Sequence, residues 1–348
     1  MKTETSSIVI DPWLVGSCYW RSWWNFPKPA FTKSDLEHVD AVVISHMHWD
    51  HWHGPTLKKY FKGKAVVTSE DPNLRSEHDL RSIGFNDITR LSHSKSLNIG
   101  DIKVTFYNFG LFLTDSAIVI EAGGTTILNA NDAKIAGWPL KQILRDHGPI
   151  DFALRSHSSA NTRVCYEIPG DKSFVSDDRE HYFRSFKLFM DVVKPKFAVP
   201  FASNHCHLND DVIKFNSYIS NPIELRDYFE ALNSELDWNL KVMLPGSTWS
   251  SNCGFSFADE ACFSDSENYI KKYLEDVNDR IAVSRNRELK LKINEKVLDR
   301  FRSVLKKSGA INFKAKVRFL ITNPDGPCES LLFNEGTLVK TDIFSENP

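Results

Sequence analysis

Residues 41–57 read AVVISHMHWDHWHGPTL, and this stretch decides both the fold and the chemistry expected of the chain. Its first part, Ala41 to Ser45, has the apolar pattern of a buried strand. The metal-binding side chains that follow are His46, His48, Asp50, His51 and His53. Residues two apart in extended backbone point the same way, so His46 and His48 can hold one metal ion while Asp50 and His51 reach a second. Zinc, manganese and iron all accept such ligands, so a metal site is predicted at the end of this strand.

The sequence around this stretch alternates β-branched runs with helical patterns. The strand-like runs are residues 40–45, 64–69, 87–92, 101–107, 116–121, 125–130, 149–156 and 194–201. Ala122, Gly123 and Gly124 provide the tight turn that a hairpin between residues 116–121 and 125–130 needs. Residues 138–148 and 177–194 have helical spacing, so both hairpins and crossovers are expected. The fold class is therefore predicted to be α/β.

The character of the sequence changes towards its C-terminal end. Residues 266–309 are charged and helical, and residues 311–342 have the pattern of antiparallel strands with an Asn-Pro-Asp-Gly turn. We therefore expect a metal-binding catalytic domain over residues 1–260. A small α+β C-terminal appendage is expected over residues 261–348.

The composition limits the classes of partner. The chain has 348 residues, of which 41% are hydrophobic and 25% charged, and its formal net charge is -2. No global basic field exists to attract nucleic acid or an anionic membrane, so neither is an expected partner. The cysteines form no Cys-x-x-Cys pair and no long apolar run occurs, so reduced thiols and a cytoplasmic location are expected. The oligomeric state stays open, a homo-oligomer included.

The motif His-Met-His-Trp-Asp-His after a strand resembles the signature of the metallo-β-lactamase superfamily. Three more segments, DPWLVGSCYWRSWWNFP at residues 11–27, NANDA at 129–133 and PFAS at 200–203, resemble a narrower branch. That branch contains ascorbate-6-phosphate lactonase and, more closely, the metal-binding domain of CMP-N-acetylneuraminate hydroxylase. The likeness covers about residues 8–220. It implies an αβ/βα sandwich with its metal site at the edge of two sheets.

The resemblance implies further metal ligands. Asp132 stands where the superfamily has its bridging aspartate, after the second strand of the hairpin. The last ligand is a histidine after residues 194–201, where His205 is preferred and His207 is a neighbour of a ligand or a substrate contact. The implied arrangement has one ion on His46, His48 and His205, a second on Asp50 and His51, and Asp132 between them. Asp50 and Asp132 are then the catalytic residues.

The superfamily's third histidine has no counterpart, because residues 101–116 contain no histidine. Asn108, Thr114 and Asp115 are the substitutes at that place, and Asp115 is the one that would bind metal strongly. His157 is a further candidate, with a buried, hydrogen-bonded histidine at a strand end as the alternative interpretation. A site with one imidazole fewer is more open and has a geometry that non-haem iron also uses.

Three functions are compatible with these residues. The first is a hydrolase, in which two divalent ions (zinc, manganese or iron) activate a hydroxide that attacks a phosphoester, lactone or thioester. The second is a dinuclear non-haem iron oxygenase or hydroxylase acting on a nucleotide sugar or natural-product precursor. The sequence has no Cys-x-His and Cys-x-x-His pairs for a Rieske centre, so that enzyme would need an external reductase. The third is a degenerate metal-binding module without activity.

The substrate is expected to be an anionic small molecule, because cationic side chains and a polar loop flank the predicted site. The tryptophan-rich segment at residues 11–29 is either a loop packed by its own aromatics or an aromatic wall over the site. The residues assigned to substrate binding are Trp20, Arg21, Trp23, Trp24, Ser158, Asn161 and Arg163.

Overall fold

The structure is a computed structural model of the chain. It describes residues 1–71, 74–109, 115–158, 179–210, 212–232, 235–288, 295–307, 316–323, 326–334 and 337–341. Thr114, Asn161 and Arg163 lie outside the described residues. The chain divides into two compact units, Met1–Tyr273 and Leu274–Pro348. Within the described ranges, no helix combines the length and the apolar character that crossing a membrane requires.

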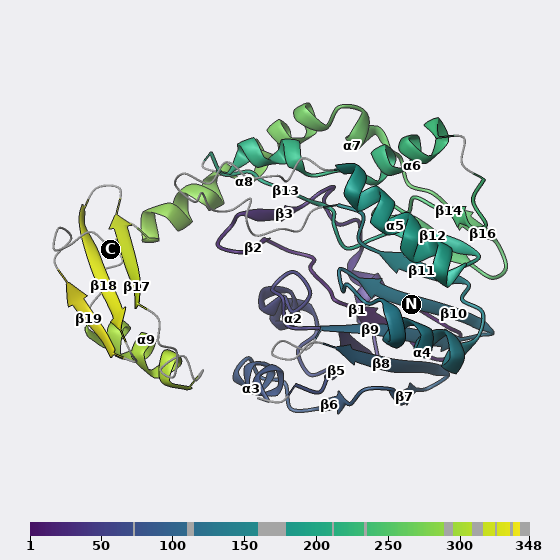
Figure 1. The fold of residues 1–348 in the computed structure, drawn as a ribbon, viewed down its shortest axis with the longest axis horizontal. Coiled ribbons are helices and arrows are strands. Elements are labelled where there is room, and N and C mark those ends of the chain that lie inside the picture. The colour runs from purple at the N-terminus through teal and green to yellow at the C-terminus, as the bar shows by residue number, and fades with distance from the viewer. Residues whose placement is uncertain are drawn as a thin grey trace. The chain divides into compact units, whose positions relative to one another are not determined.

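The first unit is built on two sheets that pack face to face (Figure 1). The smaller sheet is parallel and has the order β1 (Ile8–Ile10), β4 (Ala41–Ile44), β5 (Ala65–Ser69) and β6 (Ile88–Leu91). The larger sheet is mixed and has the order β14 (Asn239–Leu240), β12 (Phe197–Pro200), β11 (Phe152–Arg155), β10 (Thr125–Asn131), β9 (Asp115–Ala122), β8 (Ile102–Phe109) and β7 (Lys95–Ile99). The hairpin expected at Gly123 joins β9 to β10, whose register pairs Ala122 with Thr125.

Strand β4 shows why the sheets pack as they do. Successive side chains of a strand point to opposite faces. Ala41 and Val43 belong to the apolar core between the two sheets, whereas Val42 and Ile44 belong to the core beneath the helices. All four side chains are buried, as expected for a parallel strand that is covered on both faces. Other members of the core between the sheets are Ile8, Val67, Val104, Phe106, Ile118 and Ile120.

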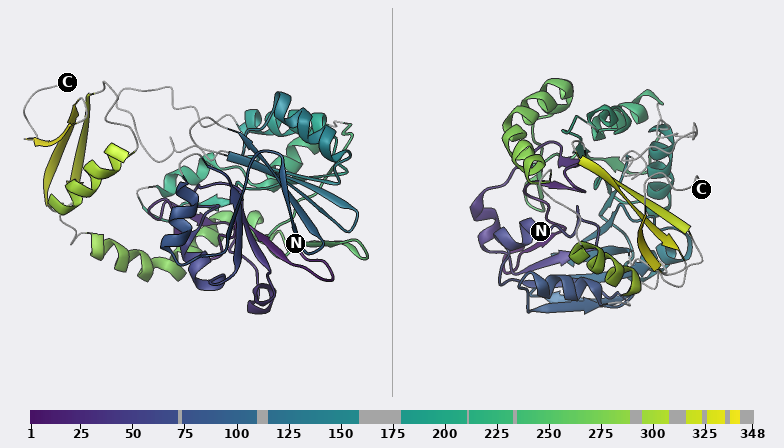
Figure 2. Two further views of the ribbon diagram at one scale, coloured as in Figure 1. Left: turned by 90° about the horizontal axis from the view of Figure 1, so that it is seen from below. Right: turned by 90° about the vertical axis from the view of Figure 1, so that its left-hand side faces the viewer.

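Helices cover the outer face of each sheet and complete the αβ/βα sandwich, which confirms the predicted fold class (Figure 2). The outer face of the smaller sheet packs on α2 (Gly54–Tyr60) and α3 (Arg75–Ser82). The larger sheet packs on α4 (Gly137–His147), α5 (Arg179–Val193) and α6 (Pro222–Ala231). Helix α5 presents Phe183, Phe186, Met190 and Val193 to this core, the helical spacing visible in the sequence.

The aromatic segment at residues 11–29 contains regular secondary structure. It contains β2 (Ser17–Cys18) and β3 (Trp23–Asn25), and β3 also pairs with β13 (His205–Cys206). Trp23 and Trp24 anchor β3 in the core, because both are buried, with 4% and 3% of their surface exposed. The pairing places the aromatic segment directly beside a histidine-bearing strand.

The rest of the first unit is short helices and one hairpin. These elements are α1 (Lys33–Glu37), η2 (Ile213–Tyr218), β15 (Thr248–Ser250), β16 (Gly254–Ser256), α7 (Ala261–Ser264) and the start of α8 (Ser266–Glu288). The second unit begins within α8 and contains α9 (Glu295–Lys307) and an antiparallel sheet of β17 (Lys316–Asn323), β18 (Gly326–Asn334) and β19 (Thr337–Thr341). The division at Tyr273 and Leu274 thus falls inside a helix rather than at a linker.

Candidate metal centre

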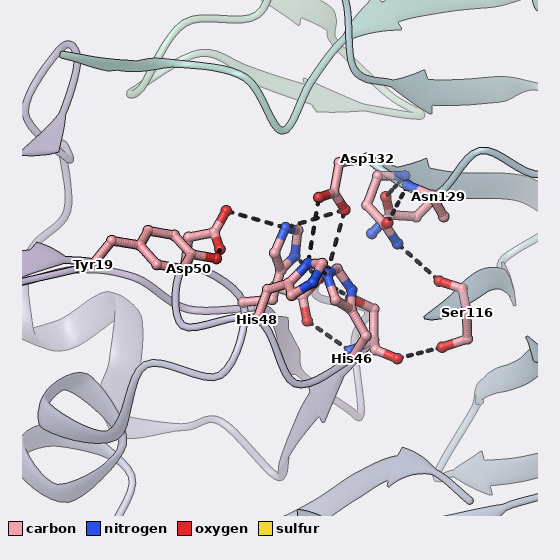
Figure 3. A network of polar contacts seen from close by, with 12 residues as sticks. Tyr19, His46, His48, Asp50, Ser116, Asn129 and Asp132 are labelled. Carbon is pink, nitrogen blue, oxygen red and sulfur yellow. Dashed lines mark hydrogen bonds and ion pairs between the residues drawn. The ribbon is translucent and has the colours of Figure 1, made fainter. Parts of the chain in front are cut away.

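The candidate metal ligands meet beyond the end of β4 (Figure 3). The Oδ1 atom of Asp132 lies 3.5 Å from His46 Nε2 and 3.4 Å from His51 Nε2. Its Oδ2 atom lies 3.8 Å from His48 Nδ1. In the described part of the chain, His46, His48 and Asp132 form the group whose ligand atoms all lie within 4.8 Å of one another. The structure therefore brings together the histidines that follow β4 and the aspartate expected after β10.

The spacing of these atoms fits a divalent ion. Ligands at about 2.1 Å from a tetrahedral ion are about 3.4 Å apart, close to the separations of Asp132 from His46 and His51. Asp132 Oδ1 is buried and accepts no hydrogen bond from any residue that the structure describes. A buried carboxylate oxygen without a donor is costly, and a cation would satisfy it. His46 Nε2 and His48 Nδ1 are 2.7 Å apart and would have to separate slightly around an ion.

Asp132 is presented by a local irregularity of β10. The register with β11 shifts between Asn129 and Asn131, and Asn131 has a φ of 40°, a left-handed conformation that asparagine tolerates better than most residues. The Asn131 side chain donates to the Ser116 carbonyl at 2.9 Å and accepts from the Ala133 amide at 2.9 Å. Ser116 in turn donates to the Ser45 carbonyl. These contacts connect the Asp132 turn to the end of β4.

Asp11 is a further candidate site residue, which the sequence patterns did not indicate. It follows β1, and its Oδ1 accepts from the Ser45 amide at 2.7 Å while its Oδ2 accepts from the Ser45 hydroxyl at 2.6 Å. Because the Ser45 hydroxyl donates its only proton to Asp11, its oxygen accepts a hydrogen bond from His46 Nδ1 at 2.9 Å. Asp11 Oδ2 also accepts from His51 Nδ1 at 2.8 Å. One carboxylate therefore fixes the orientation of both rings, so that Nε2 of His46 and of His51 points into the site.

A polar residue directly after the first apolar run was the only signal of Asp11 in the sequence. The run is three residues long, and it pairs in parallel with β4, which brings the ends of both strands together. That pairing is a long-range contact, so the residue could not be assigned from its neighbours in the chain.

Asp50 faces the site from the turn after His48 and is held from the other side by Tyr19. The Tyr19 hydroxyl donates to Asp50 Oδ1 at 2.7 Å (Figure 3). Burial, followed by the negative charge of Asp50, raises the pKa of Tyr19, so the phenol stays a donor. Asp50 Oδ2 lies 3.5 Å from His51 Nε2 and is left to face an ion or a reacting water.

The electrostatics of the cluster are those of a cation site. Burial lowers the pKa of His46 well below its ordinary value, which keeps this imidazole neutral and able to bind a metal. Burial acts in the same direction on His51, but Asp50, Asp11 and Asp132 outweigh it and raise its pKa to about 10. These carboxylates therefore favour a protonated His51 when no ion is bound. A divalent ion would displace this proton.

Asp115 is the candidate substitute for the missing histidine that the structure places near the ligands. It begins β9, is half-buried, and its charge interacts with those of His48, His51 and Asp132. Burial and then the negative charge of Asp132 raise the pKa of Asp115, against the opposing effect of His48. Asn108 instead donates to the Leu91 carbonyl at 3.0 Å.

The later histidines form a second buried group. His205 stacks on Trp23 with ring centroids 4.0 Å apart, and His207 Nδ1 donates to the Ser22 carbonyl at 2.7 Å. Nε2 of both is buried and has no hydrogen-bond partner among the described residues. His157 is also fully buried. None of the three belongs to the His46, His48 and Asp132 group, so a ligand role for His205 stays a prediction.

The residues assigned to substrate binding have different surroundings. Trp20 is 76% exposed, whereas Trp23 and Trp24 are buried. The Arg21 carbonyl accepts from Trp24 Nε1 at 3.0 Å. Ser158 is buried, and its hydroxyl accepts from the Ser220 amide at 2.8 Å. Only Trp20 of these tryptophans can be reached directly by a ligand.

The stability of the metal-free protein should fall as the pH drops below 6.5. Burial lowers the pKa of His157 and of His205 from 6.5 to about 3, so the unfolded chain takes up protons that the folded chain refuses. Each histidine should contribute about 1.4 kcal/mol of destabilisation per pH unit between pH 6.5 and about 4.5. Urea unfolding of the wild type and of His157→Asn measures this, and an equal slope in both proteins would contradict it.

Comparison with known proteins adds to this geometry. A family model described as a beta-lactamase superfamily domain matches residues 6–158. The cytidine monophosphate-N-acetylneuraminic acid hydroxylase of Sus scrofa is 42% identical over 277 residues, which cover 71% of this chain and 59% of that protein. A protein of Mycolicibacterium smegmatis that is named as a putative Rieske 2Fe-2S iron-sulfur protein is 27% identical over 267 residues. The match covers 71% of this chain and 51% of that protein.

Among solved structures, a possible metal-dependent hydrolase from Veillonella parvula is similar with a TM-score of 0.49 and 14% identity, covering 69% of this chain and 92% of that chain. The chain spans about half the length of the curated relatives with Rieske names. The motif after β4, the αβ/βα sandwich and the family match agree. Residues 6–158 therefore belong to a domain of the beta-lactamase superfamily, and the unit that contains them has the metallo-β-lactamase fold.

Proposed function

We propose that the protein is a metal-dependent hydrolase that acts on an anionic small molecule, such as a phosphoester, a lactone or a thioester. The observation that supports this most is the convergence of His46, His48, His51 and Asp132 at one strand end, with a buried carboxylate oxygen among them. Two divalent ions bound there would supply a nucleophile from water near neutral pH and attract an anionic substrate.

The residues have separate tasks in this proposal. His46, His48 and His51 would offer ring nitrogen atoms as ligands, His51 after an ion has displaced its proton, and Asp132 lies between them. Asp11 fixes the ring orientation of His46, through Ser45, and of His51. Asp50 keeps one oxygen on Tyr19 and offers the other to accept the proton of the attacking water. Hydrolysis needs no electron supply, so these residues supply what the reaction requires.

The proposal is tested by activity with defined metals. The metal-free protein is loaded with zinc, manganese or, without oxygen, ferrous iron. It is then assayed with bis(p-nitrophenyl) phosphate, an aryl lactone and an acyl thioester. We expect turnover of at least one substrate, its loss with a chelator and its return with metal. Stoichiometric metal without turnover of any of these substrates would count against a hydrolase.

A dinuclear iron hydroxylase is the second candidate, favoured by the 42% identity with the Sus scrofa hydroxylase. Such a reaction inserts one atom of O2 into a C–H bond and reduces the other to water, using two electrons and two protons. If two ferrous ions were bound at the site, they would supply the two electrons for one turnover, and an external reductase would supply those for later turnovers. The protein loaded with ferrous iron is exposed to O2 with CMP-N-acetylneuraminate, and a product one oxygen atom heavier would favour this candidate. If the protein carried out neither hydrolysis nor oxygenation, the result would favour a degenerate binding module.

A further inference from the structure

We propose that Trp20 and Trp49 form a stacking platform for a flat ring of the substrate, next to the metal centre. This inference rests on the proposed function in one respect, namely that an anionic group of the same ligand is held at the metal. The shared chemistry is a flat ring face joined to an anion by a short linker. A nucleobase and the C–H face of a sugar ring both provide such a face.

The two indole rings form an exposed pair. Trp20 is 76% exposed and Trp49 is 43% exposed, and their ring centroids are 4.9 Å apart with an interplanar angle of 55°. Tyr19 stacks on Trp49 with ring centroids 5.9 Å apart and 14° between the planes. Large aromatic side chains stabilise a fold chiefly when they are buried, and the neighbouring Trp23 and Trp24 are buried. The exposed pair therefore contributes little to the core.

The backbone that carries Trp20 is held in an unfavourable conformation. Tyr19, Trp20 and Arg21 have φ angles of 48°, 54° and 69°, all in the left-handed region that a residue with a Cβ atom disfavours. Such strain persists only where the surroundings enforce it, and it concentrates at functional sites. Here the strained turn orients the most exposed tryptophan of the aromatic segment.

Hydrogen bonds fix this turn at several points. The Ser22 amide donates to the Tyr19 carbonyl at 3.0 Å. The Arg21 carbonyl accepts from Trp24 Nε1 and from Asn209 Nδ2, both at 3.0 Å. The Ser22 carbonyl accepts from His207 at 2.7 Å. Because the backbone is already held, only the side-chain torsions of Trp20 have to be ordered when a ligand stacks on its ring.

The platform is connected to the metal centre through both of its tryptophans. Trp49 lies between His48 and Asp50 in the chain, and its carbonyl accepts from the Cys18 thiol at 3.2 Å. Trp20 follows Tyr19, whose hydroxyl donates to Asp50 at 2.7 Å (Figure 3). Tyr19 joins the two places, because its ring stacks on Trp49 while its hydroxyl contacts Asp50, so a ligand with its anionic group at the metal could extend along Tyr19 to the rings.

Three phosphate monoesters test the platform by calorimetry with the metal-loaded protein. Cytidine 5′-monophosphate carries a base, glucose 6-phosphate carries a pyranose ring, and glycerol 3-phosphate carries neither. We expect at least one of the first two to bind about 5- to 150-fold more tightly than glycerol 3-phosphate, the range that stacking on an aromatic side chain provides. The ligand that gains shows whether the flat face is a base or a sugar.

Substitutions assign the preference to the platform. Trp20→Ala and Trp20→Gly should remove it, with metal content and glycerol 3-phosphate binding unchanged. Phe257→Ala is the matched control, because Phe257 is also exposed, at 54%, and stacks on Phe255 in the separate segment at β16. It should keep the preference.

The Tm of Trp20→Gly separates the platform from a purely structural role. If Trp20 serves ligand binding, the variant should have an unchanged or higher Tm, because glycine adopts the left-handed conformation without strain. If Trp20 is structural, its removal should lower the Tm. A lower Tm with the ring preference intact would overturn the proposal. It would also be overturned if the wild type bound none of the three esters or showed no ring preference. These results are independent of turnover, so a protein that binds rings but hydrolyses nothing would refute the hydrolase and not the platform.

Discussion

Asp132→Asn should lower the affinity for the first bound metal ion by more than about 100-fold, because even residues that only support a ligand contribute about 10- to 100-fold. The substitution keeps the shape of the side chain but removes the charge shared by His46, His48 and His51. Burial acts to raise the pKa of Asp132, but the neighbouring histidines, His51 foremost, hold it well below its ordinary value, so the carboxylate is ionised in the wild type. Metal affinity is measured by competition with a chromophoric chelator.

Activity should fall with the metal in this variant, and excess metal should restore only part of it. Asp79→Asn is the matched control, because Asp79 is a partly exposed aspartate on α3 that pairs with Arg75 at 3.4 Å. It should bind metal as the wild type does. Equal metal affinity in Asp132→Asn and Asp79→Asn would show that Asp132 is not a ligand.

Asp11→Asn should weaken metal binding by about 10- to 100-fold without removing any ligand. The amide nitrogen can donate to Ser45 or His51, whereas the carboxylate only accepts, so the variant permits the wrong tautomer of both His46 and His51. The pKa of His51, which Asp50, Asp11 and Asp132 together raise against the effect of burial, should also fall. Chelator competition measures the first effect, and NMR titration of the imidazole of the metal-free protein measures the second.

The opposite end of the same sheet provides the control for this prediction. Asp40 precedes β4 and accepts from the Ser7 amide at 2.7 Å, so Asp40→Asn changes a comparable contact far along the strand from the histidines. It should leave metal affinity unchanged. If Asp11→Asn bound metal as tightly as Asp40→Asn, the proposed role of Asp11 in orienting the imidazoles would be wrong.

Much of the fold could be predicted because its signals are local. The apolar run of β4, the β-branched runs of β5, β9 and β10 and the helical spacing of α5 depend on residues close together in the chain. The ligand motif is also local, since His46, His48 and His51 all follow one strand end. Asp132 could be expected only because a family resemblance placed a ligand after the hairpin.

The features that could not be predicted from the sequence depend mostly on contacts between segments that are distant in the chain. Asp11 reaches the site because β1 pairs with β4, and Tyr19 reaches Asp50 because the aromatic segment folds back as β2 and β3. The left-handed turn at Trp20 has no glycine to mark it, so sequence patterns could not reveal it. The division at Tyr273 lies inside α8, where no change in composition marks a boundary.

The central claim is that this strand end holds a divalent metal through histidine nitrogen and aspartate oxygen atoms. Elemental analysis of protein purified without added metal, combined with X-ray absorption at the edge of whichever metal is found, tests it most directly. We expect one to two ions per chain in a shell of imidazole nitrogen and carboxylate oxygen, and loss of that shell in His46→Ala. A wild-type protein that retains no zinc, manganese or iron after incubation with each, or a His46→Ala variant with an unchanged shell, would contradict the claim.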